Sequence, residues 1–170
     1  MSNKTFRIFI SHSWTYRHHY YDLLHLLRNC QSYPDVEIID YSVPEHDPIH
    51  DADNVRDLCR AIKNQMAPAQ VVVMLGGVYS SYSKWIRKEI ALAKCKFQKP
   101  KPVLLVRPRG NKRLSCPVQC AADEVVEWNC RSILEAIEKL EKFDLFIKDC
   151  ESVRDCINRE CNEQMEKCPL

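Results

Sequence analysis

The sequence predicts an α/β fold in which a five-stranded parallel sheet is covered by helices on both faces. Short apolar segments alternate with segments whose apolar residues recur every three or four positions, which is typical of alternating strands and helices. Segment 70–75 is apolar on both faces, as expected for a strand in the middle of a parallel sheet. Right-handed crossovers between such strands favour the flavodoxin-like order 2-1-3-4-5.

Each element has its own signal. The apolar segments predict strands at 7–10, 36–39, 70–75, 103–106 and 124–128. The helical spacing of apolar residues predicts helices over 20–27, 55–66, 83–97 and 133–140. Asp51 or Asp53 can cap the second helix, and Pro68 ends it. We expect residues 107–120 to form a long loop.

The chain divides into a domain at 1–142 and a C-terminal helical extension at 143–170. The extension carries one loose apolar stripe, formed by Phe146, Cys150, Val153, Ile157, Cys161, Met165 and Cys168. A helix exposed to solvent on all sides would not need this stripe, so we expect it to pack on the domain or on a second subunit.

Composition excludes several classes of protein. The 170 residues include 25 Lys and Arg against 23 Asp and Glu, which gives a net charge of +2. This balance provides no general attraction to nucleic acid or to a membrane surface. No apolar run approaches the roughly 18 residues of a membrane span. The N-terminus has no apolar signal segment, so we expect a cytoplasmic protein.

Ten cysteines need an explanation. A disulfide framework requires an oxidising compartment and is typical of small domains with little core, and neither condition is indicated. We therefore expect reduced thiols that act as small apolar side chains. A metal site built from the C-terminal cysteines is the second interpretation. His18 and His19 are adjacent and point apart on a helix, so a histidine metal cluster is not expected.

The strand order predicts where a ligand binds. In open α/β sheets, ligands bind beyond the carboxyl ends of the strands where the strand order reverses, here between the first and third strands. Small, polar and aromatic residues follow these two strands, namely Ser11, His12, Ser13, Trp14, Gly76, Gly77 and Tyr79. Two glycines let a ligand approach the backbone, so the sequence predicts a nucleotide crevice. The alternatives are a simple Gly-Gly turn and a Trp14 that fills the core.

One acidic residue stands out in the third predicted helix. Trp85 and Glu89 are spaced i, i+4 and share a helix face, and apolar residues surround Glu89 in the sequence. Glu89 is therefore a candidate for chemistry in the crevice. The alternative is a solvated glutamate that pairs with another residue of its helix.

The order of several motifs resembles the TIR-like family, and within it the TIR-like (ThsB-type) subunit of bacterial Thoeris antiphage systems. The resemblance covers residues 5–140. The motifs that carry it are Phe9-Ile10-Ser11-His12-Ser13-Trp14, Tyr41-Ser42-Val43-Pro44 with His46-Asp47-Pro48, Gly76-Gly77-Val78-Tyr79, Ser83-Lys84-Trp85-Ile86-Arg87-Lys88-Glu89-Ile90 and Trp128-Asn129.

The resemblance implies an enzyme that cleaves the nicotinamide–ribose bond of NAD+, with Glu89 as its catalytic residue. NAD+ is then the substrate, and no other cofactor and no metal are expected. It also implies a cyclic ADP-ribose-type product that activates a separate effector, and a phage-derived molecule is a possible trigger. The 40–53 loop corresponds to the segment that TIR domains use for self-association and gating, and we expect the C-terminal helix to contribute to self-association.

Residues around the crevice receive binding roles on this hypothesis. Trp14, Tyr79 and Trp85 offer flat faces for stacking, while Ser11, Ser13 and the backbone at 76–77 can hold phosphate or ribose oxygens. His12 is expected to bind substrate or to fix its loop. Tyr41 either contacts the ligand or shapes the loop. The sequence does not separate a hydrolase from a cyclase.

Three other classes of protein are compatible with this fold. A non-catalytic TIR-type interaction module, assembling through the 40–53 loop and the extension, is the main alternative. A phosphoacceptor receiver is disfavoured, because Gly76-Gly77 stands where such a domain needs an aspartate. A flavin site has no separate support.

Overall fold

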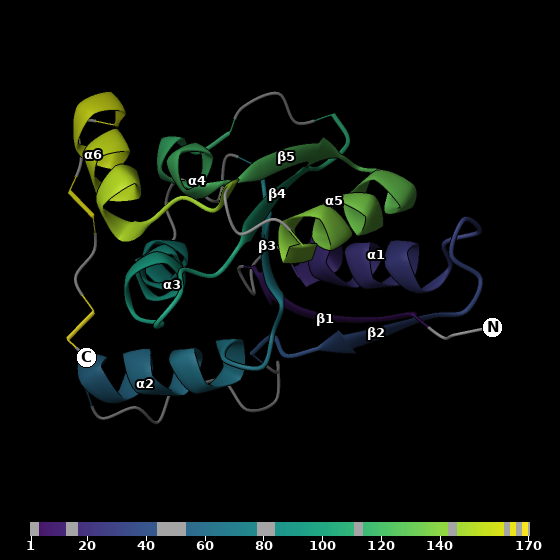
Figure 1. Cartoon of the computed structure of the whole chain (residues 1–170), viewed down its shortest axis with the longest axis horizontal. Helices are drawn as coiled ribbons and strands as arrows, with labels where there is room; N and C mark the ends of the chain where they lie inside the picture. The colour runs from purple at the N-terminus through teal and green to yellow at the C-terminus, as the bar shows by residue number, and fades with distance from the viewer. Residues whose placement is uncertain are drawn as a thin grey trace.

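A five-stranded parallel sheet forms the centre of the protein, as seen in a computed structural model (Figure 1). The model describes residues 4–12, 17–43, 54–77, 84–110, 114–142, 146–161, 164–165 and 168–169. The strands, in chain order, are β1 (Lys4–Ser11), β2 (Val36–Asp40), β3 (Val71–Leu75), β4 (Val103–Arg107) and β5 (Glu124–Glu127). They lie in the order β2-β1-β3-β4-β5, which confirms the predicted fold class.

Burial follows the place of each strand in the sheet. Every residue of β3 is buried, and so are the first four residues of β4. The edge strands β2 and β5 instead alternate between more and less exposed positions. The run of valines in β3 therefore faces helices on both sides, as its lack of alternation predicts.

Helices cover both faces of the sheet (Figure 1). On one face, α1 (Arg17–Arg28) and α5 (Cys130–Lys142) enclose a core with β1 residues such as Ile8 and Ile10. On the other face, α2 (Val55–Met66), α3 (Lys84–Cys95) and α4 (Cys116–Ala121) pack over Phe9, Val72 and Met74. A sixth helix, α6 (Cys150–Glu160), lies outside α3 and α4 and belongs to the same core.

Two local predictions, the cap of the second helix and the 107–120 loop, were wrong. Asn54 caps α2, because its side chain accepts a hydrogen bond from the Asp57 backbone N–H at 3.0 Å; Asp51 and Asp53 lie outside the described residues. The predicted 107–120 loop contains α4, a short helix that starts with a proline in its first turn. Proline is favoured in the first turn of a helix, because a backbone N–H at that position would have no hydrogen-bond partner within the helix.

The C-terminal extension packs on the domain, but its helix is shorter than predicted. Among the described residues of the extension, α6 covers Cys150–Glu160, and the Asp149 side chain caps it by accepting from Ser152 N–H at 2.8 Å. Val153 and Ile157 are buried in the core beside α3 and α4. Phe146, predicted on the apolar stripe, is 63% exposed. The helix thus begins after Phe146, so the stripe is not continuous.

The expectation of reduced thiols is wrong in this structure, which pairs all ten cysteines in five disulfides. One bond, Cys30–Cys130, joins the segment that follows α1 to the first residue of α5. The other four join the C-terminal segment to the domain: Cys59–Cys168, Cys95–Cys150, Cys116–Cys161 and Cys120–Cys156. Partners are 36 to 109 residues apart, so no local spacing reveals the pairs before the fold is known.

Among the described residues, no helix combines the length and apolar character that crossing a membrane requires.

Candidate functional site

The site is built on the carboxyl end of β1 and on the first half of α3. Glu89 is 5% exposed, and the Ser11 hydroxyl donates a hydrogen bond to its carboxyl group. Ser11 is itself 1% exposed and is the last residue of β1. The alternative of a solvated Glu89 is therefore wrong. The carboxyl group lies inside the fold, beside the first strand of the pair where the strand order reverses.

The position of α3 explains this burial. Helix α3 lies between α2 and α4 on the sheet, and α6 covers it further (Figure 1). Its residues Ile86, Ile90, Leu92 and Ala93 are all buried. A helix enclosed on so many sides has few solvent-facing positions. Glu89 consequently occupies a place that an apolar residue would fill in a purely structural helix.

Burial also changes the acidity of this residue. Loss of hydration raises the pKa of Glu89 to about 8, and the Ser11 hydrogen bond opposes that rise. In the described part of the chain, the carboxyl group pairs with this hydroxyl and with no cationic side chain. Near neutral pH the protonated form of Glu89 is therefore favoured. A cationic ligand beside it would favour the ionised form.

A second group of polar residues lies at the carboxyl ends of β1 and β2. The Asp40 carboxylate accepts hydrogen bonds from the Tyr20 hydroxyl and from Ser42, whose N–H donates at 2.9 Å. The Ser42 hydroxyl also accepts from Ile10 N–H at 2.7 Å. Burial, followed by the hydrogen bond to Asp40, raises the pKa of Tyr20. These bonds fix the chain where it leaves β2.

His12 joins this group rather than the Glu89 pair. Its ring stacks on Tyr20, with centroids 4.3 Å apart, and its Nδ1 lies 3.0 Å from the Ile10 carbonyl oxygen. This geometry fits a role in fixing the loop. Sequence reasoning missed Tyr20 and Asp40, because Tyr20 fits the apolar face of its helix. Asp40 could have been found from the sequence as a polar residue at the end of a predicted strand.

The other predicted residues are less closely grouped. Trp85 is the second residue of α3, lies one turn before Glu89 and is 39% exposed. Tyr41 is partly buried on the core of the α2–α3 face, and its N–H donates to the Ile8 carbonyl at 2.9 Å. Ser13, Trp14 and Tyr79 lie outside the described residues.

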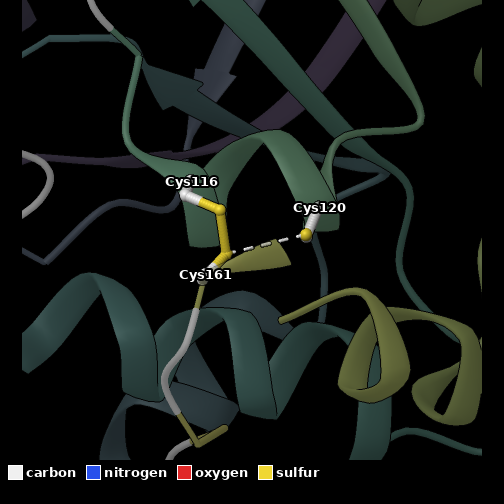
Figure 2. A group of neighbouring side chains, drawn as sticks. All are labelled: Cys116, Cys120 and Cys161. Atoms are coloured by element: carbon white, nitrogen blue, oxygen red, sulfur yellow. Dashed lines mark hydrogen bonds between the residues drawn. A yellow bond between two sulfur atoms is a disulfide. The ribbon is translucent and has the colours of Figure 1, made fainter. Parts of the chain in front are cut away.

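The two glycines follow β3 as predicted. Gly76 N–H donates to the Val106 carbonyl oxygen at 2.8 Å, and a side chain at Gly76 would overlap Leu114 Cδ2. The group that lies close to the Gly76 backbone is therefore the Leu114 side chain. Gly77, the next residue, is the last one described before the gap at 78–83. In the described residues, potential metal ligands group elsewhere, at Cys116, Cys120 and Cys161 (Figure 2).

The comparison with protein families adds to this geometry. The family model described as "Thoeris protein ThsB, TIR-like domain" matches residues 9–113, which include the carboxyl end of β1, all of α3 and the residues Ser11 and Glu89. The chain belongs to the Thoeris ThsB TIR-like family. It is therefore a Thoeris-type TIR-like defence protein, and the predicted family is confirmed. No curated protein matches the chain.

The family match ends well before the C-terminal segment. It includes Ser11, Glu89 and the glycines after β3, but it stops before α4, α5 and α6. The segment that four disulfides fasten to the domain thus lies outside the matched region of the ThsB TIR-like family.

Proposed function

We propose that this protein cleaves the nicotinamide–ribose bond of NAD+ and that Glu89 is its catalytic residue. The supporting observation is the buried Glu89 carboxyl group, hydrogen-bonded to Ser11 at the end of β1 where the strand order reverses. Membership of the ThsB TIR-like family supports the same function. A buried carboxyl group without a cationic partner among the described residues destabilises the fold, so a chemical role accounts for its presence.

The chemistry follows from the charge that develops during cleavage. Nicotinamide leaves as a neutral molecule and leaves positive charge on the ribose, as in the oxocarbenium-like transition states of glycoside cleavage. An ionised carboxylate near that carbon stabilises the charge, and the low-dielectric surroundings of Glu89 strengthen the attraction. The nicotinamide ring of NAD+ is cationic before cleavage. Its arrival therefore favours the ionised form of a carboxyl group whose pKa is about 8 in the free protein.

The burial of Glu89 has a consequence for regulation. With 5% of the residue exposed, the described conformation gives substrate little access to the carboxyl group. We therefore propose that this conformation is a resting state of the protein. A phage-derived trigger, or self-association through the 40–53 loop and the C-terminal helix, then uncovers Glu89. The product is a diffusible nucleotide that acts on a separate effector. The proposed location of the protein is the cytoplasm.

The test measures nicotinamide released from NAD+ by the wild type and by Glu89→Gln. It is run with purified protein and with extract from phage-infected cells, because the resting protein has little access to substrate. Glu135→Gln, the same change at an exposed carboxylate on the opposite sheet face, is the control. We expect Glu89→Gln to lose at least about a hundredfold in rate, the usual cost of removing one charge-stabilising group, and Glu135→Gln to retain activity.

Equal background release by the wild type and Glu89→Gln under both conditions would instead favour the non-catalytic interaction module. Mass analysis of the products separates the hydrolase from the cyclase. A linear ADP-ribose indicates attack by water, and a cyclic isomer indicates attack by a group of the same molecule.

A further inference from the structure

Four cysteines of α4 and the C-terminal segment form two neighbouring disulfides on the outer side of the α2–α3–α4 layer. Cys116 and Cys120 are one turn apart on α4, and Cys156 and Cys161 lie at the end of α6. The structure pairs them as Cys116–Cys161 and Cys120–Cys156. The two disulfides adjoin, because Cys120 Sγ lies 3.8 Å from Cys161 Sγ (Figure 2). In the part of the chain that the structure describes, the other six cysteines form no such group.

The spacing of these sulfur atoms fits a metal centre. Zinc in a four-cysteine site is tetrahedral with Zn–S bonds of about 2.3 Å, which places neighbouring sulfurs about 3.8 Å apart. Cys120 Sγ and Cys161 Sγ already have this separation, and the Sγ atoms of Cys116, Cys120 and Cys161 all lie within 4.8 Å of one another. Cys156 Sγ is not one of these three atoms, but its bond to Cys120 makes it the nearest source of a fourth thiolate.

The change from disulfides to a metal site needs only small movements. A disulfide holds its sulfurs about 2 Å apart, so each pair must open by somewhat less than 2 Å to reach tetrahedral spacing. Rotation about the Cα–Cβ bonds supplies a displacement of this size. The Cα atoms of both pairs are 5.6 Å apart, so α4 and α6 already hold the four side chains in reach of one ion.

The surroundings can also support the charge of such a site. Four thiolates and one Zn²⁺ carry a net charge of −2, which is costly where Cys120 is 4% exposed. Lys148 brings a positive charge to the same place, because its Nζ donates a hydrogen bond to the Cys120 carbonyl oxygen at 3.1 Å. Groups of this kind next to the ligands are a common part of metal sites.

We propose that Cys116, Cys120, Cys156 and Cys161 form a zinc tetrathiolate site in the reduced protein, and that the two disulfides are the oxidised form of this site. Two molecules of a dithiol reduce the two disulfides to four thiols and become disulfides themselves. Binding of Zn²⁺ then releases the four thiol protons. Either form links α4 to α6, so the C-terminal segment stays attached under oxidising and reducing conditions. This proposal departs from the sequence-based expectation of no metal, and it does not depend on NAD+ cleavage.

The first test uses Co²⁺ as a visible probe for the zinc site. The full chain is reduced with a phosphine, separated from the reductant without oxygen, and titrated with Co²⁺. We expect one equivalent to bind with the absorption of tetrahedral cobalt thiolate, and Zn²⁺ to displace it. Cys116→Ser/Cys161→Ser should lose this spectrum, and Cys30→Ser/Cys130→Ser should retain it. Both variants keep eight cysteines, so nonspecific binding is matched. Absence of the spectrum from the wild type, or equal spectra in the two variants, overturns the proposal.

A second measurement needs no variant. The reduced wild type is alkylated with and without one equivalent of Zn²⁺, and mass spectrometry identifies the protected cysteines. We expect zinc to protect the four cysteines of α4 and α6 and to restore any helical signal lost on reduction, because metal binding and folding are linked. Protection spread over all ten cysteines, or absent from these four, contradicts the proposal even where a variant fails to fold.

Discussion

Two buried ionisable side chains of α3 lie five residues apart and have different surroundings. Lys94 and its partner Asp123 are fully buried, with Nζ and Oδ2 2.6 Å apart. The same Asp123 oxygen accepts from Val103 N–H at 2.7 Å, and its other oxygen accepts from Lys148 N–H at 2.7 Å. Glu89 has the Ser11 hydroxyl and, within the described residues, no opposite charge.

The difference separates a structural pair from a candidate catalytic group. Asp123 connects α3, β4 and the segment leading to α6, so both oxygens of its carboxylate accept hydrogen bonds from structural partners. Burial lowers the pKa of Lys94, and the Asp123 carboxylate opposes that change. Among the described residues, nothing comparable compensates Glu89. Removing one partner of a compensated buried pair destabilises the fold, whereas a buried carboxyl group without an opposite charge is a cost that function must explain.

The largest expected effect comes from breaking the compensated pair. Lys94→Ala leaves the Asp123 carboxylate buried without its cation, which should reduce the free energy of unfolding by about 3–5 kcal/mol. Urea denaturation measures this loss. The control is Lys139→Ala, which removes a half-exposed partner of Glu124 and should cost about 1 kcal/mol or less. Similar losses of unfolding free energy in the two variants would contradict the large effect expected from breaking the Lys94–Asp123 pair.

A second effect comes from the uncompensated carboxyl group and depends on pH. Because burial raises the pKa of Glu89 to about 8 from 4.5, the folded protein holds this proton more tightly than the unfolded chain does. The stability that this proton contributes is complete below pH about 4.5 and is lost as the pH rises through about 8. Relative to Glu89→Gln, the wild type should lose up to about 1.4 kcal/mol per pH unit between these values.

Denaturation of both proteins at several pH values measures this difference. The difference should level off above pH about 8, where the folded protein is also ionised. A constant difference between pH 5 and 8 would mean that Glu89 is already ionised in the folded protein, as a compensated carboxylate would be.

The smallest effect isolates Ser11, the hydrogen-bond partner that the described part of the chain provides for Glu89. Ser11→Ala removes the hydrogen bond that opposes the rise in the pKa of Glu89, so this pKa should increase further. The loss of one hydrogen bond should cost about 0.5–1.5 kcal/mol. Ser42→Ala removes another buried hydroxyl, which contacts Asp40 instead, and should leave the pKa of Glu89 unchanged. The carbon-13 signal of the Glu89 carboxyl group reports both results, and equal shifts in the two variants would contradict this role for Ser11.

The sequence predicts one of these two regions better than the other. Apolar segments and right-handed crossovers were enough for the strand order, and the strand order placed Ser11 and Gly76 at the reversal point. Lys94 could not be found in this way. A lysine among apolar helix residues is equally compatible with a head group that reaches solvent, and its partner Asp123 lies 29 residues away.

The C-terminal segment was predicted least well. Its apolar residues indicated contact with the domain, which Val153 and Ile157 make. Helix α4 was missed because six residues with a proline provide too short a pattern for periodicity. The cysteine pairs depend on how distant segments meet, and this follows from tertiary packing.

Direct titration of Glu89 tests the central claim most directly. With carbon-13 in glutamate side chains, the signal missing from Glu89→Gln identifies this carboxyl group, and its shift is followed against pH. We predict a midpoint near pH 8 in the free protein. Bound to an uncleavable NAD+ analogue, with a methylene in place of the ribose ring oxygen, the midpoint should fall because the nicotinamide is cationic. A midpoint near 4.5 that the bound analogue leaves unchanged would contradict both the buried carboxyl group and its place in the NAD+ site.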